Sequence, residues 1–180
     1  MHALALAKSG RAAEAIEPLQ ECIAKRNDRT YTSPFKGSVG TPPFHLLADC
    51  LGRSGDLEGA LKGYKTALEM DPESLGIRHD YAKLLAHQNR PEEAIELLNQ
   101  AIQSDSMESR LWTLGCQIVN GHLNDIDIAL RWTECAIEEF PKNPEIRKQR
   151  GIALITAGQF EDALPLFEET PPHPLTDAAR

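Results

Sequence analysis

The sequence predicts an all-α fold, a right-handed solenoid of about five helix-turn-helix repeats (the first one partial) with about ten helices. The main observation is a Gly or Asn followed five positions later by Ala. The second is that apolar residues recur at three- and four-residue steps around this frame. The pairs are Gly10 and Ala15, Gly55 and Ala60, Asn89 and Ala94, Asn124 and Ala129, and Gly158 and Ala163. Successive alanines are 45, 34, 35 and 34 residues apart, which indicates a period of about 34 residues.

Each repeat is predicted to contain two amphipathic helices joined by a turn. Gly and Asn tolerate the left-handed backbone conformation that ends a helix, so they mark the turn. Asp56 and Asp125 directly follow turn residues and can cap the second helix, whereas Pro72 and Pro141 stand where that helix should end. The predicted segments are a partial repeat over 1–26, an inserted loop over 27–40, repeats over 41–74, 75–108, 109–143 and 144–170, and a proline-rich tail over 171–180.

The repeat that starts at Thr41 has the most complete pattern. It reads Phe44, Leu47, Ala48, Leu51, Gly55, Ala60, Tyr64, Ala67 and Pro72. This pattern resembles the tetratricopeptide repeat, which has large, large, small and large residues in its first helix, then Ala, an aromatic residue, Ala and Pro. Related patterns in the other repeats extend the resemblance over nearly the whole chain. The resemblance implies that the first helices of successive repeats line a concave surface.

Charge and composition argue against several classes of partner. Lys and Arg number 19 and Asp and Glu 27, which gives a net charge of −8 and predicts no binding to nucleic acid or to an anionic membrane surface. The sequence has neither a run of 18 apolar residues nor a basic leader. The four cysteines are widely spaced, which predicts a reducing compartment, a cytoplasmic location and no metal site.

The sequence contains no motif for a catalytic or cofactor site, so we expect neither enzyme activity nor a cofactor. His45 and His79 do occupy the same position in successive first helices. An acid–base or metal site there would need a convergent partner such as Asp49. We interpret the two histidines as polar residues that line a groove.

The candidate peptide-binding site is this groove. Positions of the first helices that should face it carry His45, Asp49, His79, Lys83, Arg110, Thr113, Gln117 and Lys148. The alternative is that these residues are only solvated and that the binding surface lies elsewhere. The resemblance does not extend to the lysine and asparagine clamp with which some family members hold chaperone tails, because only Arg110 fits that pattern.

The sequence therefore favours a non-catalytic scaffold that binds a protein or peptide through the groove or through uncapped ends, which would also permit a homodimer. A first alternative is a helical appendage of a larger enzyme, since residues 26–51 loosely resemble the repeat tail of bacterial family-2 glycosyltransferases. A second alternative, a helical-repeat RNA binder, conflicts with the acidic charge.

Overall fold

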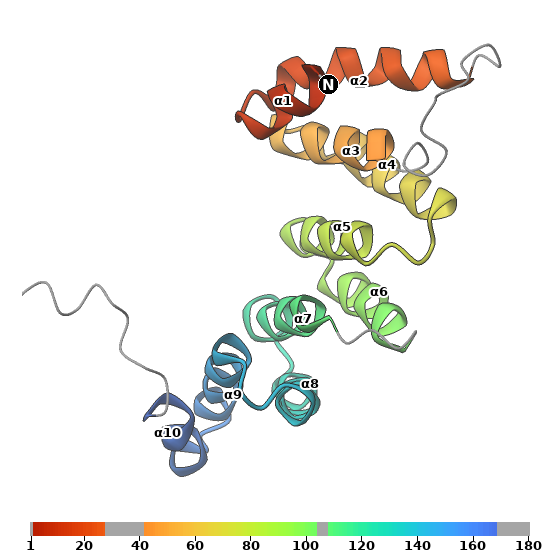
Figure 1. Ribbon diagram of the computed structural model, residues 1–180. Helices are drawn as coiled ribbons and strands as arrows, with labels where there is room; N and C mark the ends of the chain where they lie inside the picture. The colour runs from red at the N-terminus through yellow and green to blue at the C-terminus, as the bar shows by residue number, and fades with distance from the viewer. Residues whose placement is uncertain (1, 28–41, 104–107, 169–180) are drawn as a thin grey trace, which may run out of the picture. The chain divides into compact units, whose positions relative to one another are not determined.

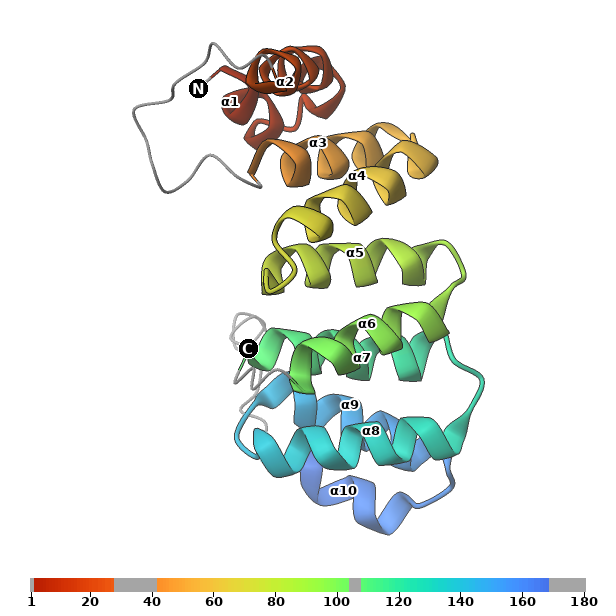
Figure 2. The same ribbon diagram turned by 90° about the vertical axis from the view of Figure 1, so that its right-hand side faces the viewer.

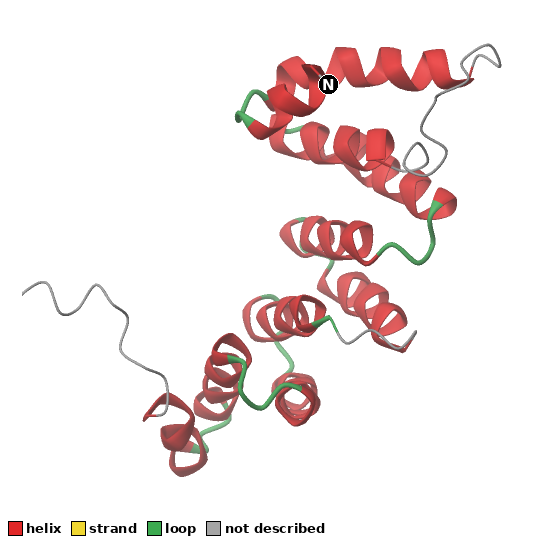
Figure 3. Cartoon of the chain, in the orientation of Figure 1, coloured by secondary structure: helices red, strands yellow, loops and turns green. Residues whose placement is uncertain are grey.

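The computed structural model describes residues 2–27, 42–103 and 108–168, and these form ten helices with no strand among them (Figure 3). The helices are α1 (His2–Lys8), α2 (Ala12–Asn27), α3 (Pro42–Ser54), α4 (Leu57–Met70), α5 (Leu75–His87), α6 (Pro91–Gln103), α7 (Ser109–Gly121), α8 (Ile126–Glu139), α9 (Pro144–Thr156) and α10 (Phe160–Glu168) (Figure 1). The predicted loop over 27–40, apart from Asn27 at the end of α2, and the predicted tail over 171–180 lie outside the described residues.

The chain divides into two compact bodies, Met1–Gln88 and Asn89–Arg180. The N-terminal body contains α1 to α5, and each helix packs on the next along the chain. The C-terminal body contains α6 to α10 with the same order of neighbours, and α7 also contacts α9 (Figure 2). Packing between consecutive helices is the arrangement expected when each hairpin buries its apolar face only against its neighbours.

The turns between paired helices follow the predicted chemistry at four of five positions. Gly10, Gly55, Gly158 and Asn89 have positive φ angles of 84°, 94°, 76° and 58°. Asn124 does not have a positive φ, so the expectation of a left-handed residue is wrong there. The reason is a longer turn, because α7 ends at Gly121 and α8 begins only at Ile126.

Side-chain caps and proline stops fix the ends of the second helices. The carboxylates of Asp56 and Asp125 accept hydrogen bonds from the N–H groups of Gly59 and Ile128, each at 2.9 Å, which confirms both predicted caps. A cap of this kind stabilises a helix by about 1 kcal/mol. As predicted, α4 and α8 end at Met70 and Glu139, shortly before Pro72 and Pro141.

In two of the turns that lead from one repeat to the next, an arginine of the following helix donates a hydrogen bond to the turn. Arg78 in α5 donates from Nε and Nη2 to the carbonyl oxygen of Pro72, at 3.0 and 2.7 Å. Arg147 in α9 donates to the carbonyl oxygen of Pro141 at 3.4 Å. The spacing of six residues is the same in both repeats, so these contacts are a feature of the repeated structure.

The five alanines that follow the turn residues, which we call the alanine ladder, are buried in both bodies, and their small size explains the close approach of paired helices. Ala15, Ala60, Ala94, Ala129 and Ala163 are all at most 7% exposed. In the C-terminal body the ring of Trp132 from α8 covers Gly115 of α7 so closely that a Cβ there would overlap the indole. Trp132 is buried and its ring lies 5.7 Å from that of Trp112, so it belongs to the core.

Candidate binding groove

The N-terminal body carries a groove between the first helices α3 and α5. One pocket of about 310 Å³ is lined by Asp49, Gly52, Arg53, Leu57, Tyr64, Asp80, Lys83, Leu84 and His87. A second pocket of about 400 Å³ is lined by Leu4, His45, Leu46, Asp49, Asp71, Ser74, Ile77 and Asp80. The two pockets share Asp49 and Asp80, and we call them together the α3/α5 groove. It includes the predicted site residues His45, Asp49 and Lys83.

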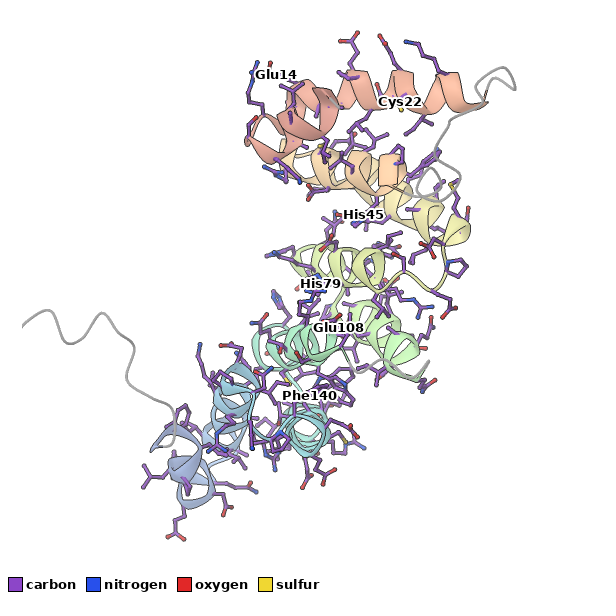
Figure 4. All side chains as sticks on the ribbon, in the orientation of Figure 1. Glu14, Cys22, His45, His79, Glu108 and Phe140 are labelled. Atoms are coloured by element: carbon purple, nitrogen blue, oxygen red, sulfur yellow. The ribbon has the colours of Figure 1, made fainter. Side chains whose placement is uncertain are left out.

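Asp80 joins the two predicted histidines at the middle of this groove. His45 extends from α3 and His79 from α5 (Figure 4). The Nε2 atom of His45 lies 2.8 Å from one carboxylate oxygen of Asp80, and the Nδ1 atom of His79 lies 2.9 Å from the other. Both oxygens of Asp80 are therefore engaged, and the bond from His45 ties neighbouring repeats together.

The environment of Asp80 keeps its carboxylate ionised. Partial burial works to raise the pKa of Asp80, but hydrogen bonds from His45 and His79, together with the charge of their rings, outweigh it. The net result is a pKa well below the usual range for an aspartate. A carboxylate held in this way is a fixed acceptor in the groove wall rather than a general acid.

Replacing Asp80 by asparagine should lower the free energy of unfolding by about 1 kcal/mol at pH 7, because the charged hydrogen bonds are lost from a partly exposed site. A pKa lowered by folding contributes stability above the unfolded-state value of about 4 and loses it as the pH falls through the folded-state value. The difference in unfolding free energy between the wild type and the Asn variant should thus persist down to about pH 4 and become smaller below it. Urea unfolding at a series of pH values measures this, with the exposed Glu69→Gln as control. An Asn variant as stable as the control at pH 7 would contradict the assignment.

Aromatic rings form the inner part of the groove. Tyr64, from α4, is buried, and its ring stacks on Tyr81 of α5 with centroids 5.8 Å apart and an angle of 16°. The ring of His45 lies 5.7 Å from Tyr64 on the α3 side. Burial, with nearby negative charge, raises the pKa of the Tyr64 phenol, so it stays neutral at physiological pH. The groove therefore has an aromatic base beneath a polar rim.

The charged groups of the rim differ in their partners. Arg53 donates to Asp49 at 3.4 Å and to the carbonyl oxygen of Ala7 at 3.0 Å. Lys83 is exposed, and among the described residues no hydrogen bond or ion pair involves its ammonium group. The groove thus pairs Asp49 and Asp80 with protein groups and leaves the Lys83 ammonium available.

The remaining predicted residues lie in the C-terminal body, on α7 and α9. Arg110 pairs with Glu108 at 3.0 Å. Gln117 donates to Glu145 at 3.4 Å, and Lys148 pairs with the same carboxylate at 3.6 Å. Thr113 lies on α7 as well and is half-buried. These predicted cations are paired with acidic residues in their own helix or at its start, so they differ from Lys83.

Glu145, on α9, is the centre of a polar network in the C-terminal body. Besides Gln117 and Lys148, it accepts a hydrogen bond from Gln149 at 2.9 Å. Hydrogen bonding from Gln149 is the largest cause of a lowered pKa at Glu145. Asn120 of α7 in turn donates to the side chain and backbone of Gln149, at 2.9 and 2.8 Å. The network joins α7 to α9 through amide groups.

The acid that contacts both histidines is Asp80, whereas Asp49, the kind of partner that an acid–base or metal site would need, pairs with Arg53. The sequence did contain a signal for this contact, because Asp80 follows His45 by 35 residues, one position beyond the repeat period.

Within the described residues of the chain, no three His, Cys, Asp or Glu side chains are grouped so as to hold a metal ion. None of the helices described there is long and apolar enough to cross a membrane.

Comparisons with known proteins identify the repeat. The family model of the tetratricopeptide repeat matches residues 53–117. A comparison with curated proteins found no match. Among solved structures, MamA from Desulfovibrio magneticus RS-1 is similar with a TM-score of 0.71 and 14% identity, over 93% of this chain and 88% of that chain. Another MamA crystal structure has a TM-score of 0.69 and 16% identity, and the match covers 91% of this chain and 88% of that chain.

A third similar structure is YrrB, described as a TPR protein with an unusual peptide-binding site. Its TM-score is 0.60 and its identity 21%, over 83% of this chain and 71% of that chain. At these identities the likeness concerns the fold, and it agrees with the helix order and the alanine ladder found in both bodies.

Proposed function

Because the chain belongs to the tetratricopeptide-repeat family and has the all-α fold class of its solenoids, we propose that it is a non-catalytic scaffold that binds an extended segment of a partner protein. The α3/α5 groove carries this proposal. It is open, it spans two successive first helices, and its walls are held in place by the bonds of Asp80. Such a preorganised surface binds a peptide with little further loss of conformational entropy. The peptide-binding site for which YrrB is described agrees with the proposal.

The predicted site residues have distinct roles in the proposal. In the N-terminal body, His45, Asp49 and Lys83 form the polar rim, of which Lys83 makes direct contact with the ligand, and His79 holds Asp80 in place. In the C-terminal body, Arg110, Thr113, Gln117 and Lys148 offer a second polar surface on α7 and α9, where Glu145 orders two of them. A ligand on either surface needs neither metal nor cofactor.

Thiol chemistry offers no evident route to catalysis in the core. Burial raises the pKa of the Cys116 thiol to about 12, and burial also raises the pKa of Cys50, so neither is a nucleophile at neutral pH. Cys22 and Cys135 are exposed and free of disulfides. Exposed free thiols are usual in a reducing compartment, which supports a cytoplasmic location within the proposal. Attachment to a larger enzyme such as a glycosyltransferase stays a prediction.

Selection of short random peptides against the immobilised full chain tests the groove directly. We expect selected peptides to bind with micromolar dissociation constants, equivalent to about −8 kcal/mol. Amide chemical-shift changes should then concentrate at α3 and α5 or at α7 and α9. Peptides that bind only elsewhere, or a selection that yields none, would contradict the proposal.

Helix α10 supplies a second candidate surface, for self-association. Phe160, Leu164 and Phe167 follow one another at four- and three-residue steps and are 65%, 59% and 37% exposed. In the internal repeats the next first helix covers the matching face, where Ile95 and Leu98 are 9% and 0% exposed. We propose that a second copy of the chain covers the α10 face in a homodimer.

The variant Leu164→Glu tests this contact, because it places a charge in the exposed apolar stripe. Sedimentation at several concentrations should show a dimer for the wild type and a monomer for the variant. The control is Lys142→Glu, which adds a negative charge at an exposed position outside α10. A wild type that stays monomeric at all concentrations would refute the homodimer and leave the groove proposal untouched.

A further inference from the structure

The acidic residues of the α3/α5 groove are already engaged within the protein. Asp80 uses both carboxylate oxygens, one with His45 and one with His79. Asp49 is paired with Arg53. A basic ligand would have to compete with these partners for either carboxylate. The presence of two acids in the groove is therefore a poor reason to expect a basic partner.

Lys83 differs from these two acids in its exposure and in its partners. It lies on α5 one turn after His79 and one turn before His87, and it lines the same pocket as Asp80. Its side chain is exposed, and no partner for the ammonium group is found within the ranges that the structure describes. An exposed ammonium group at the edge of a pocket can pair with a carboxylate without losing an existing ion pair.

Part of the pocket wall near Lys83 is apolar. The same pocket is lined by Leu57, Leu84 and the buried ring of Tyr64. Leu57 is 44% exposed although it is large and apolar. A ligand side chain that covers Leu57 and Leu84 removes apolar surface from water, which favours binding by about 25 cal/mol for each Å² buried.

We propose that the groove recognises a partner segment in which an acidic residue stands beside a large apolar residue. The carboxylate pairs with the ammonium group of Lys83, and the apolar side chain lies over Leu57 and Leu84. The inference rests on the proposed function, because it names the class of peptide that the groove takes. The net charge of −8 does not prevent this, since exposed charges more than about 8 Å apart are largely screened at physiological salt.

Four fluorescein-labelled peptides in one Gly/Ser frame test the proposal, with the central pairs Glu-Leu, Gln-Leu, Lys-Leu and Glu-Ser. Binding to the full chain is followed by fluorescence anisotropy. We expect Glu-Leu to bind most tightly, with Gln-Leu weaker by about three- to fivefold and Lys-Leu weaker by about five- to tenfold. Glu-Ser should also bind more weakly, because it lacks the apolar contact. Equal binding of Glu-Leu and Lys-Leu would overturn the charge assignment.

Two variants and one control separate the components of the contact. Lys83→Glu should reverse the order of the peptides, so that Lys-Leu binds better than Glu-Leu. Lys62→Glu makes the same charge change at an exposed lysine of α4 that does not line the groove, and it should keep the wild-type order. Leu57→Ser, at an exposed position, should abolish the preference for Glu-Leu over Glu-Ser.

The outcomes also distinguish this inference from the proposed function. If selected peptides bind along α3 and α5 but Lys83→Glu and Lys62→Glu change their affinity equally, the acidic–apolar class is wrong and the scaffold proposal stands. If none of the four peptides binds, the inference is overturned as well, and the peptide selection alone decides on the scaffold. A reversal of order in Lys83→Glu supports both.

Discussion

Replacing Gly115 by alanine is expected to lower the stability of the C-terminal body by about 2–3 kcal/mol. A Cβ at this position of α7 would overlap the six-membered ring of Trp132, whose nearest atoms are Cζ2 and Cε2. Trp132 is only 9% exposed and is packed against Trp112, so the ring has little room to move away. Overpacking of a core in this way costs about 1–3 kcal/mol, and a rigid indole belongs at the upper end.

The same substitution at Gly121, the last residue of α7, is the matched control. A Cβ on Gly121 would have no atom within 4 Å, and the backbone there is not left-handed. Gly121→Ala should therefore leave stability unchanged or raise it by up to about 1 kcal/mol through helix propensity. Urea denaturation followed by tryptophan fluorescence reports directly on Trp112 and Trp132. If both variants had equal midpoints, the close packing of Trp132 on Gly115 would be refuted.

Replacing Tyr64 by alanine is expected to destabilise the N-terminal body by about 3–5 kcal/mol, the largest effect that we predict there. The Tyr64 ring is 4% exposed, stacks on Tyr81 and packs with Ala48 and Ile77. Its removal leaves a cavity between α3, α4 and α5 that these neighbours cannot fill, and large aromatic truncations have costs of this size. The same change removes the base of the α3/α5 groove.

Tyr64→Phe separates the ring from its hydroxyl group. It retains the stacked ring, so its stability should lie within about 1 kcal/mol of the wild type. Thermal unfolding followed by circular dichroism measures both variants, and about 1 kcal/mol corresponds to about 2–4 °C for a chain of this length. A Phe variant as unstable as the Ala variant would show that the hydroxyl group, and not ring packing, holds this position.

The sequence was sufficient to predict those features of the fold that depend on backbone spacing. A buried alanine is required wherever two helices approach closely, so Ala60 and Ala94 recur at the repeat period and reveal the hairpins. Caps behave similarly, because Asp56 and Asp125 act on amides only three residues away. The φ angle of Asn124 was not predicted correctly, because the turn there has one more residue. The added residue changes the path of the backbone, although an Asn still stands at the turn position.

The partners of the groove residues could not be read from the sequence in the same way. Asp80 contacts His45 because α3 and α5 lie side by side, and it contacts His79, its neighbour in α5, through a choice of side-chain rotamer that the repeat period does not reveal. Arg110 and Lys148 have the same residue types as a binding cation but pair with Glu108 and Glu145. Spacing of three along a helix could have indicated the pair of Lys148, whereas the availability of Lys83 became visible only in the structure.

The arginine contacts at Pro72 and Pro141 imply that two of the junctions between repeats are reinforced. Arg78 and Arg147 donate hydrogen bonds to the segments that connect α4 to α5 and α8 to α9. The equivalent position at the start of α7 is Trp112, which has no guanidinium group to give. Opening motions that separate neighbouring hairpins should therefore meet added resistance between α4 and α5 and between α8 and α9.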